Sequence, residues 1–518
     1  MSSVYDNKSC LDKMTFQECE LAILRDAVDE SEKVQGQKIA TNEDVKKVIK
    51  ILEDFLQARP LICYGGTAIN NILPKSEQFY NRDIEIPDYD FYSKNAMDIA
   101  KELADIYAEN GYTEVEAKAG MHFGTYKVFV NFIPIADITH LDEVIFDELL
   151  KDSIKIAGIK YASPNFLRMN MFLELSRPAG DVSRWEKIYK RMVLLNKHYP
   201  LNPRTNCNNI SFQRVMDKNS FKSSNVSHED LHIIIRDTLT SMSAIFFGGY
   251  ACTLYSRYMK KEEQRIIKKI PDFDVILEDI DRSAIILKER LEEHGFKHLT
   301  FIQHANIGEL IPRHIEVRVD NIAVAFIYEP IACHSYNKLV LGNNIEVCVA
   351  TIDTMLTFYL AFLYAKKDYY KKERILCMAT FLFRVQQKNR LSQKGLLKRF
   401  TIDCYGKQPT IEDIRAKKVE KFKELFNKKG TREYDEWFLK YNPNLVNQQK
   451  QKVSETPIMK KSIFEKSSGF EKMLEDTKDS QKSEKKSILS RRAPYKKRRR
   501  NRTNRKKQSV GMGAKFLF

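Results

Sequence analysis

Residues 61–91 read LICYGGTAINNILPKSEQFYNRDIEIPDYDF, and this stretch decides the fold. Its apolar start is typical of a buried strand, and Gly65 and Gly66 then break the strand before a segment that can open a helix at Thr67. Two glycines let a phosphate approach the backbone closely, and a helix N-terminus offers free N–H groups at the positive end of its dipole. The pattern therefore predicts a phosphate cradle, and an ordinary strand-to-helix turn is the alternative.

Three carboxylates follow the predicted cradle. Asp88 and Asp90 stand two apart in IEIPDYDF, so a strand there puts both side chains on the same face. Asp137 ends a further apolar run over residues 132–136. Carboxylates this close raise each other's pKa unless cations lie between them, which favours bound Mg²⁺ or Mn²⁺. Three aspartates beside a phosphate cradle predict two-metal phosphoryl transfer, and a solvated strand edge is the alternative for the first two.

These motifs resemble those of the polymerase-β-like nucleotidyltransferases, in which a glycine pair precedes an Asp-x-Asp pair and a distal Asp. The chain departs from the common pattern at Thr67 and in the 22-residue step from Gly66 to Asp88. A second stretch, residues 161–199, closely resembles the segment after the catalytic domain in the poly(A) polymerases of poxviruses, African swine fever virus and giant amoeba viruses. The resemblance covers residues 61–200 and extends more loosely to residue 426.

The resemblance implies an enzyme that adds AMP from ATP to the 3′-hydroxyl of viral mRNA without a template. Asp88 and Asp90 would bind both metal ions, and Asp137 would help to position and deprotonate the hydroxyl. The residues that would hold the triphosphate are Gly65, Gly66 and Thr67. Two alternatives stay open: another nucleotidyltransferase, of the tRNA-end-adding or second-messenger type, and a non-enzymatic RNA-binding scaffold.

Partners and location are implied by the resemblance in the same way. The partners would be RNA at its 3′ end and ATP. A homodimer is expected because the giant-virus branch is the nearer one, and a methyltransferase-type processivity subunit, as in poxviral relatives, is the alternative. The expected location is the virion and the viral factory in the host cytoplasm.

The second half of the chain repeats the first. Residues 245–277 read IFFGGYACTLYSRYMKKEEQRIIKKIPDFDVIL, where Gly249 follows Gly66 by 183 residues and Asp272 follows Asp88 by 184. Two tandem nucleotidyltransferase-like domains are therefore predicted. The strand matching the one before Asp137 should lie within residues 322–328, which hold no carboxylate. The second domain is accordingly predicted to be a degenerate copy that supports the first.

A basic helix follows the catalytic segment. Residues 183–186, SRWE, fit a capping box and predict a helix over 184–197 with an apolar face and a basic face. A solvated basic face is the alternative to contacts with substrate. The proposed nucleotide contacts are Lys187 and Arg191, and the proposed RNA contacts are Arg184 and Lys190.

The charge of the chain is concentrated in its tail. The 518 residues carry a net charge of +17, and residues 481–518 hold 15 Lys and Arg against one acid, Glu484. Such a polycation, with Arg498, Arg499 and Arg500 at its centre, binds phosphate backbones without sequence preference. Nuclear targeting or packaging is the alternative role. From about residue 442 the composition lacks the apolar residues of a core, so the tail is predicted to be disordered.

The predicted fold class is α/β (α+β), with small mixed sheets flanked by helices. The predicted parts are a catalytic domain over 1–200, a degenerate domain with C-terminal helices over 201–440, and a linker with the basic tail over 441–518. Helices are predicted over 15–34, 41–57, 352–385 and 410–426. The N-terminus has no signal-peptide pattern, and no apolar run is long enough for a membrane span. Nine cysteines without a C-x-x-C pair predict reduced thiols and no zinc site.

Overall fold

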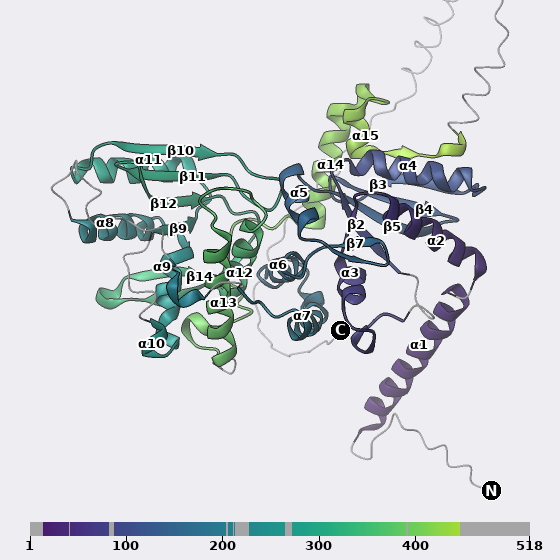
Figure 1. Cartoon of the computed structure of the whole chain (residues 1–518), viewed down its shortest axis with the longest axis horizontal. Coiled ribbons are helices and arrows are strands. Elements are labelled where there is room, and N and C mark those ends of the chain that lie inside the picture. The colour runs from purple at the N-terminus through teal and green to yellow at the C-terminus, as the bar shows by residue number, and fades with distance from the viewer. Residues whose placement is uncertain are drawn as a thin grey trace, which may run out of the picture. The chain divides into compact units, whose positions relative to one another are not determined.

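The glycine-rich stretch lies in the middle of a mixed eight-stranded sheet (Figure 1). The computed structural model describes residues 14–40, 42–81, 87–203, 206–210, 212, 227–264, 272–389 and 392–445, and all of them lie within one compact unit. The strand order is β16-β3-β4-β5-β2-β1-β7-β6. The bounds are β1 Ile62–Tyr64, β2 Tyr89–Ser93, β3 Val115–Ala119, β4 Thr125–Val130, β5 Ile133–His140, β6 Ile154–Ile156, β7 Ile159–Tyr161 and β16 Lys440–Tyr441.

Helices flank this first sheet, and the apolar spacing that predicts them also supplies their buried faces. α4 contacts β3, β4 and β5. The helix ends just before Gly111, which takes a φ of 91° that glycine adopts without strain. The bounds are α1 Phe16–Ala40, α2 Glu43–Ala58, α3 Gly65–Ile72, α4 Ala96–Glu109, α5 Glu143–Lys151, α6 Pro164–Leu175 and α7 Trp185–His198, with short 3₁₀ turns η1 Lys75–Glu77, η2 Val182–Arg184 and η3 Cys207–Asn209.

The second sheet repeats the topology of the first. Its order is β10-β11-β12-β9-β8-β14-β13-β15, in which β12 and β9 are parallel just as β5 and β2 are. The bounds are β8 Ile245–Phe247, β9 Phe273–Ile276, β10 Leu299–His304, β11 His314–Val319, β12 Ile322–Tyr328, β13 His334–Val340, β14 Glu346–Ala350 and β15 Cys404–Tyr405. The duplication predicted from the repeated motif is therefore confirmed at the level of strand order and direction.

Helices also accompany the second sheet. The bounds are α8 His228–Ser241, α9 Gly248–Tyr255, α10 Lys261–Gln264, α11 Ile280–Glu293, α12 Ile352–Phe362 and α13 Lys372–Lys388, with 3₁₀ turns η4 Ser256–Tyr258, η6 Gly342–Asn344 and η7 Gly395–Leu397. The single helix predicted over 352–385 is wrong, because the chain turns between α12 and α13 where Lys366 takes a positive φ of 48°. The polar sequence KKDYYKK at 366–372 supplies that turn.

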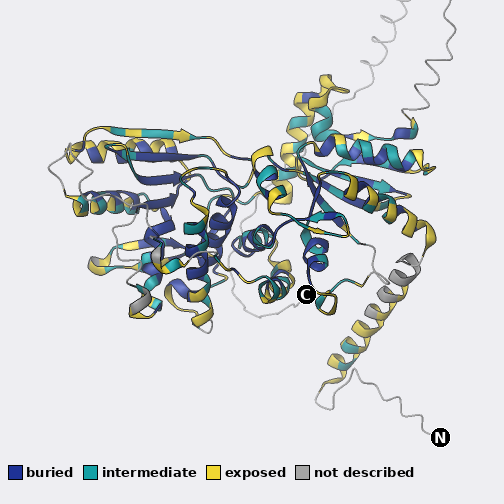
Figure 2. Ribbon diagram, viewed as in Figure 1, coloured by how far each residue is buried: buried dark blue, intermediate teal, exposed yellow. Residues whose placement is uncertain are grey.

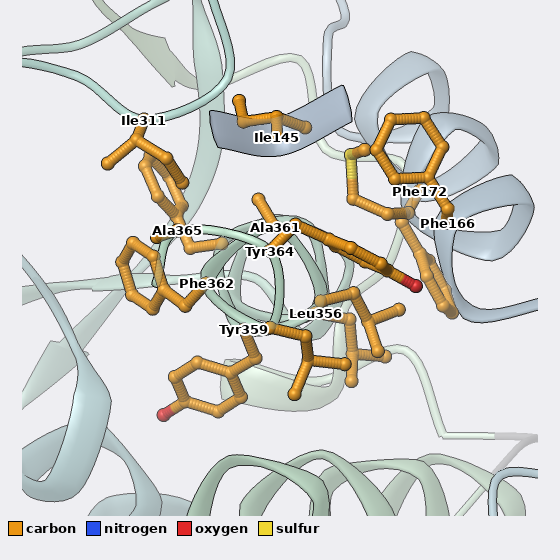
Figure 3. Packing of buried hydrophobic residues seen from close by; sticks show 14 of the residues in the cluster. Ile145, Phe166, Phe172, Ile311, Leu356, Tyr359, Ala361, Phe362, Tyr364 and Ala365 are labelled. Atoms are coloured by element: carbon orange, nitrogen blue, oxygen red, sulfur yellow. The ribbon is translucent and has the colours of Figure 1, made fainter. Parts of the chain in front are cut away.

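α12 is the centre of the core between the two sheets. Every residue of α12 is buried, and the helix contacts both α6 and α13. Figure 3 shows Tyr364, just after α12, beside Phe166 of the first half, and the two ring centres are 5.1 Å apart. Figure 2 shows the same region as continuous buried ribbon. The two copies of the fold therefore share buried apolar surface.

The last helices pack on the first sheet and not on the second. α14 (Ile411–Leu425), η8 (Phe426–Lys428) and α15 (Arg432–Phe438) lead into β16, which pairs with β3. Lys101 of α4 forms an ion pair with Asp435 at 3.0 Å. This placement differs from the expectation that residues 410–440 accompany the second domain. The boundaries at 200 and 440 stay predictions.

The starts of two helices are capped by different residues. At α14, Thr410 and Asp413 form a capping box. At α2, Thr41 lies outside the described residues, and the cap is Asn42, whose side chain accepts from the N–H of Asp44 at 2.8 Å. Across the described residues, no helix combines the length and the apolar character that crossing a membrane requires.

The prediction of reduced thiols is wrong for the cysteines that form disulfide bonds. Disulfide bonds join Cys207 to Cys377 and Cys333 to Cys404, with Cα–Cα distances of 5.4 and 5.2 Å. The partners are 170 and 71 residues apart in sequence, so local spacing gives no sign of either pair. The free cysteines among the described residues are Cys63, Cys252 and Cys348.

Candidate active site

The glycine pair forms a tight turn between β1 and α3, and each glycine faces a different functional group. Gly65 takes a φ of 73°, and a Cβ there would lie 2.5 Å from Oδ2 of Asp90. A Cβ at Gly66 would lie 2.5 Å from the hydroxyl of Tyr80 and 3.0 Å from both terminal nitrogens of Arg191. Any larger side chain at either position would displace one of these groups. The cradle is therefore open only because both residues are glycine.

Strand register brings four functional side chains into one row across the sheet. Tyr64 pairs with Asp90, Asp90 pairs with Asp137, and Asp137 pairs with Lys127. Directly paired residues present their side chains on the same face. The side chains of Lys127 and Asp137 form an ion pair. The predicted juxtaposition of Asp90 and Asp137 is present in the structure, and the row also contains two residues that the sequence reading missed.

Asp88 lies just before β2, beside the same row. Its carbonyl oxygen accepts a hydrogen bond of 2.6 Å from the hydroxyl of Thr67, which is buried at the start of α3. Thr67 therefore ties the cradle helix to the carboxylate strand. Because the Thr67 hydroxyl already donates to the carbonyl oxygen of Asp88, Thr67 would contact a triphosphate through its main chain.

Burial and mutual repulsion shape the charge of the carboxylates. Burial, followed by repulsion from Asp88 and Asp137, raises the pKa of Asp90 to about 7. Burial, followed by repulsion from Asp137, raises the pKa of Asp88. Such a set gains stability from a cation placed among its oxygens.

The donor set suits a hard divalent cation, for which carboxylate oxygens are preferred ligands. In the present side-chain positions, no group of three or more His, Cys, Asp or Glu among the described residues is gathered closely enough to hold an ion. Lys127 is the cation nearest the third carboxylate, through its ion pair with Asp137. The residues therefore suit a metal ion in their chemistry and in their position on the sheet. To coordinate the ion together, their side chains would have to move closer to one another.

α7 brings a basic face toward the cradle. Its side chains form one wall of a cavity of about 540 Å³, and Phe79 and Tyr80 form the other. Arg191 donates to the Tyr80 hydroxyl at 2.6 Å and lies 5.1 Å from the centre of the Phe79 ring. Lys187 and Lys190 also line this cavity, so the two predicted nucleotide contacts, Lys187 and Arg191, lie in the same cavity.

The two predicted RNA contacts, Lys190 on α7 and Arg184 at the end of η2, both lie near carboxylates. Lys190 pairs with Glu186 at 2.7 Å, and Arg184 lies 3.5 Å from Glu174. The predicted capping box at Ser183 is wrong: Asp181 accepts from both the N–H and the hydroxyl of Ser183 and caps η2, the 3₁₀ turn that precedes α7. The predicted tail contacts Arg498, Arg499 and Arg500 lie outside the described residues.

The corresponding site of the second copy lacks one carboxylate and is filled by ring systems. Phe326 pairs with Asp274 as Asp137 pairs with Asp90, so a phenylalanine replaces the third carboxylate. A Cβ on Gly248 would lie 2.1 Å from Oδ2 of Asp274, and Phe247 packs against Tyr328 with ring centres 5.2 Å apart. The absence of a carboxylate at this position was expected from residues 322–328.

Missed residues share a cause. Lys127 lies in the alternating strand TYKVFV, and the period of two predicts that it shares a face with Thr125. Its pairing with Asp137 could not be predicted in this way, because the pairing depends on strand register. Tyr80 lies in a polar loop between the glycines and the aspartates, and only the fold brings it to Arg191.

The site thus contains three carboxylates in the first copy, whereas a phenylalanine stands at the third position in the second copy. Residues 50–181 match the family described as poly(A) polymerase catalytic subunit, which confirms the resemblance stated from the motifs. That segment contains the cradle and all three aspartates.

Two relatives carry the same family description. The one from Acanthamoeba polyphaga mimivirus is 33% identical over 186 residues, which is 35% of this chain and 30% of the relative. The one from African swine fever virus, isolate Tick/Malawi/Lil 20-1/1983, is 29% identical over 164 residues, which is 30% of this chain and 34% of the relative. The matches thus span about a third of these relatives' own length.

The likeness to a solved structure is broader. The crystal structure of the Megavirus polyadenylate synthase superposes with a TM-score of 0.68 at 20% identity, over 89% of this chain and 93% of the other. Sequence likeness therefore centres on the catalytic segment, whereas the common fold extends over both sheets.

Proposed function

We propose that the chain is a template-independent poly(A) polymerase that transfers AMP from ATP to the 3′-hydroxyl of viral mRNA. The observation that carries the proposal is the placement of three aspartates on one face of the sheet beside a glycine cradle, inside residues 50–181 that match the catalytic-subunit family. The printed names of the relatives and of the structural neighbour support polyadenylate synthesis as the reaction.

In this reaction the 3′-hydroxyl oxygen attacks the α-phosphorus of ATP. A bond forms between that oxygen and phosphorus, the bond from the α-phosphorus to the β-bridging oxygen breaks, and pyrophosphate leaves with the electron pair. The hydroxyl proton is lost to solvent. Little covalent chemistry is asked of the protein, so positioning and charge stabilisation supply most of the acceleration.

The chain's own groups supply that positioning. Gly65 and Gly66 admit the triphosphate, because no Cβ fills the space that faces Asp90 and Arg191. The register of β2 on β5 aligns Asp90 with Asp137 at the reacting end. Asp88, Asp90 and Asp137 would hold two Mg²⁺ or Mn²⁺ ions, which when bound acidify the attacking hydroxyl and neutralise the triphosphate.

Extension of a labelled RNA primer with each of the four NTPs, in Mg²⁺ or Mn²⁺, tests the function. We expect long products with ATP alone. Asp88→Asn with Asp90→Asn should lower incorporation by at least about 100-fold, since charge stabilisation of this size is typical of such sites. Extension with CTP, or with every NTP equally, would favour another nucleotidyltransferase. RNA binding that survives in a chain without activity toward any NTP would favour a scaffold.

We further propose a homodimer, with a methyltransferase-type processivity subunit as the alternative, and a location in the virion and in the viral factory of the host cytoplasm. These proposals rest on the resemblance to viral relatives. Sedimentation of the full chain across a concentration series tests the dimer, and a monomer that extends primers only after a partner is added would contradict it. Detection of the protein in purified virions tests the location.

We also propose that the basic tail increases RNA residence. Its 15 cations against one acid predict binding that weakens steeply with salt. Deletion of residues 481–518 should reduce the slope of log affinity against log salt. An unchanged affinity and slope would contradict the proposal.

A further inference from the structure

The hairpin between β3 and β4 and the helix α15 carry an exposed aromatic pair at the edge of the first sheet. Phe123, at the tip of the hairpin, is 47% exposed, and its ring centre lies 4.5 Å from that of Trp437 on α15. The ammonium of Lys417 on α14 lies 5.8 Å from the centre of the Trp437 ring. These three residues are called the hairpin platform below. Exposed rings beside a cation are the groups on which proteins bind unpaired bases and their phosphates.

The hairpin platform is held in place by hydrogen bonds between the hairpin and the C-terminal helices. The amine of Lys418 on α14 donates to the carbonyl oxygen of Gly120 at 2.6 Å. The hydroxyl of Tyr126 donates to the carbonyl oxygen of Glu436 on α15 at 3.1 Å. The hairpin is thereby tied to both helices, so the two rings of the platform keep their relative position. Rings that are already ordered lose little conformational freedom when a ligand binds.

The cation of the hairpin platform differs from its neighbours in having no acidic partner. Lys421 pairs with Glu424 at 2.7 Å, and Lys428 pairs with Glu433 at 2.8 Å. Within the part of the chain that the structure describes, no carboxylate pairs with Lys417. An unpaired cation beside exposed rings complements a ligand in which negative charges alternate with flat apolar groups. Single-stranded RNA has this chemistry, because phosphates and unpaired bases alternate along it.

The order of the strands gives the side from which the primer would approach. Across the sheet the strands run β1, β2, β5, β4 and β3, with the glycine turn directly after β1 and Asp137 on β5. In phosphoryl transfer the attacking and leaving oxygens lie roughly in line, on opposite sides of the phosphorus. A triphosphate at the glycine turn therefore leaves the side of β4 and β3 for the primer. The hairpin platform lies on that side.

The hairpin platform is also close to the reacting end. Lys127, which pairs with Asp137, is four residues after Phe123, so the Cα atoms of Lys127 and Phe123 are at most about 14 Å apart. Between them lies Thr125, whose hydroxyl is 3.2 Å from that of Thr139. The surface between the carboxylates and the platform is therefore polar. A strand with its 3′-hydroxyl at Asp137 can reach the platform with its upstream nucleotides.

We propose that the hairpin platform binds the RNA primer upstream of its 3′ end, with unpaired bases stacked on Phe123 and Trp437 and a phosphate held by Lys417. The inference rests on the proposed function, because the direction of the primer follows from the assigned reaction. Every base has a face that stacks, so the platform binds RNA without regard to its sequence. A transcript and the poly(A) added to it can therefore use the same surface.

Binding of fluorescently labelled RNA to the full chain, without ATP, tests the proposal. Phe123→Ala should weaken the binding of a single strand by at least about fivefold, which is the lower end for loss of one base stack. It should not change the binding of an RNA duplex of equal length, because paired bases are not free to stack on the rings. Equal losses with single strand and duplex would overturn the stacking role.

Two further variants separate ring from charge. Trp437→Ala should weaken single-strand binding as Phe123→Ala does, and Trp437→Phe, which keeps a ring, should retain most of the affinity. Lys417→Gln should reduce the slope of log affinity against log salt by about 0.7, the value for one phosphate contact on a single strand. An unchanged slope would overturn the role of Lys417.

Steady-state extension of primers of different lengths locates the contact. Phe123→Ala should raise the KM for a long primer and should raise it less for a dinucleotide primer, which is too short to extend from Asp137 to the platform. The KM for ATP should not change. An equal rise in the primer KM at both lengths would overturn the upstream position of the contact.

Phe426→Leu with Lys429→Gln is the matched control. This pair also places an amine over a ring, at 4.5 Å from its centre, and Phe426 is 51% exposed. Phe426 follows Lys417 by nine residues, which is about two and a half helical turns, so the two side chains point to opposite sides of α14. The control should leave RNA affinity and the primer KM unchanged. Losses equal to those of Phe123→Ala would overturn the platform as a specific site.

The two measurements also separate this proposal from the proposed function. If the chain extends no primer but Phe123→Ala weakens single-strand binding as expected, the hairpin platform stands and the assigned reaction fails. If the chain extends primers but RNA affinity and primer KM are the same in all the platform variants, the reaction stands and the platform fails. Variants that alter the sedimentation of the chain without altering RNA binding would assign the rings to a contact between protein molecules and overturn the proposal.

Discussion

At the scale of single residues, burial sets the charge of side chains that look ordinary in the sequence. Asp90 is held among other carboxylates, and burial is the largest cause of its raised pKa. His334 of β13 is fully buried, its ring lies 5.0 Å from that of Phe358, and neither ring nitrogen has a hydrogen-bond partner among the described residues. Burial, followed by the positive charge of Arg177, lowers the pKa of His334 to about 3.

The pH dependence of stability follows from His334. Because its folded pKa of about 3 lies below the unfolded value of about 6.5, the unfolded state binds an extra proton between these pH values. The contribution of His334 to the free energy of unfolding should therefore be fully present above pH 6.5. Below that pH it should decrease by up to about 1.4 kcal/mol per pH unit. His334→Leu and His334→Gln should both flatten this slope in urea unfolding between pH 7 and pH 5, and only His334→Leu should raise the midpoint. Equal slopes in all three proteins would contradict the assignment.

At the level of helices and strands, α12 differs from the amphipathic helices because it is buried on all sides. α12 lies between α6 and α13, and its exposed neighbours in sequence begin only after the turn at Lys366. α14, by contrast, is capped by Thr410 and Asp413 and buries only Leu425. Two segments that are both predicted to be helices thus bury very different numbers of residues in the core.

Substitutions in these two helices measure the difference. Leu356→Ala in α12 removes a side chain with no exposed surface and leaves a cavity, so it should lower the free energy of unfolding by about 2–5 kcal/mol. Val419→Ala in α14 changes a side chain that is 55% exposed and should have an effect within about 0.5 kcal/mol. Urea titration followed by circular dichroism provides both values, and similar costs would contradict the central place of α12.

At the level of the whole molecule, one fold occurs twice, and the two copies differ in the residue at the position of the third carboxylate. The order and direction of seven strands are repeated, yet Phe326 occupies the register position of Asp137. The copies are joined through buried contacts, among them a 2.6 Å hydrogen bond between Ser163 and Tyr364. We therefore expect the second copy to support the first in the proposed enzyme.

Paired substitutions in the two copies test this division. Asp272→Asn with Asp274→Asn should leave most primer extension, because the second copy lacks a third carboxylate. Asp88→Asn with Asp90→Asn is the matched change in the first copy and should abolish extension. If a folded Asp272→Asn, Asp274→Asn variant were inactive, the second copy would have a direct part in the reaction.

The glycine turn, the grouping of the aspartates and the duplication could be predicted from the residues alone, because each depends on short motifs and on periodic patterns that few residues specify. The turn at Gly65, the pairing of Asp90 with Asp137 and the repeat at Gly248 were all open to prediction. The strand order of the two sheets confirms the duplication, and residues 50–181 match the catalytic-subunit family.

Only the tertiary structure decided which distant groups meet. The ion pair of Lys127 with Asp137 depends on strand register, and the contact of Tyr80 with Arg191 joins residues 111 apart. The same holds for β16 on β3 and for the disulfide bonds. Such contacts depend on how elements pack, and packing depends on the sum of many weak interactions along the chain, so no local pattern of residues specifies them.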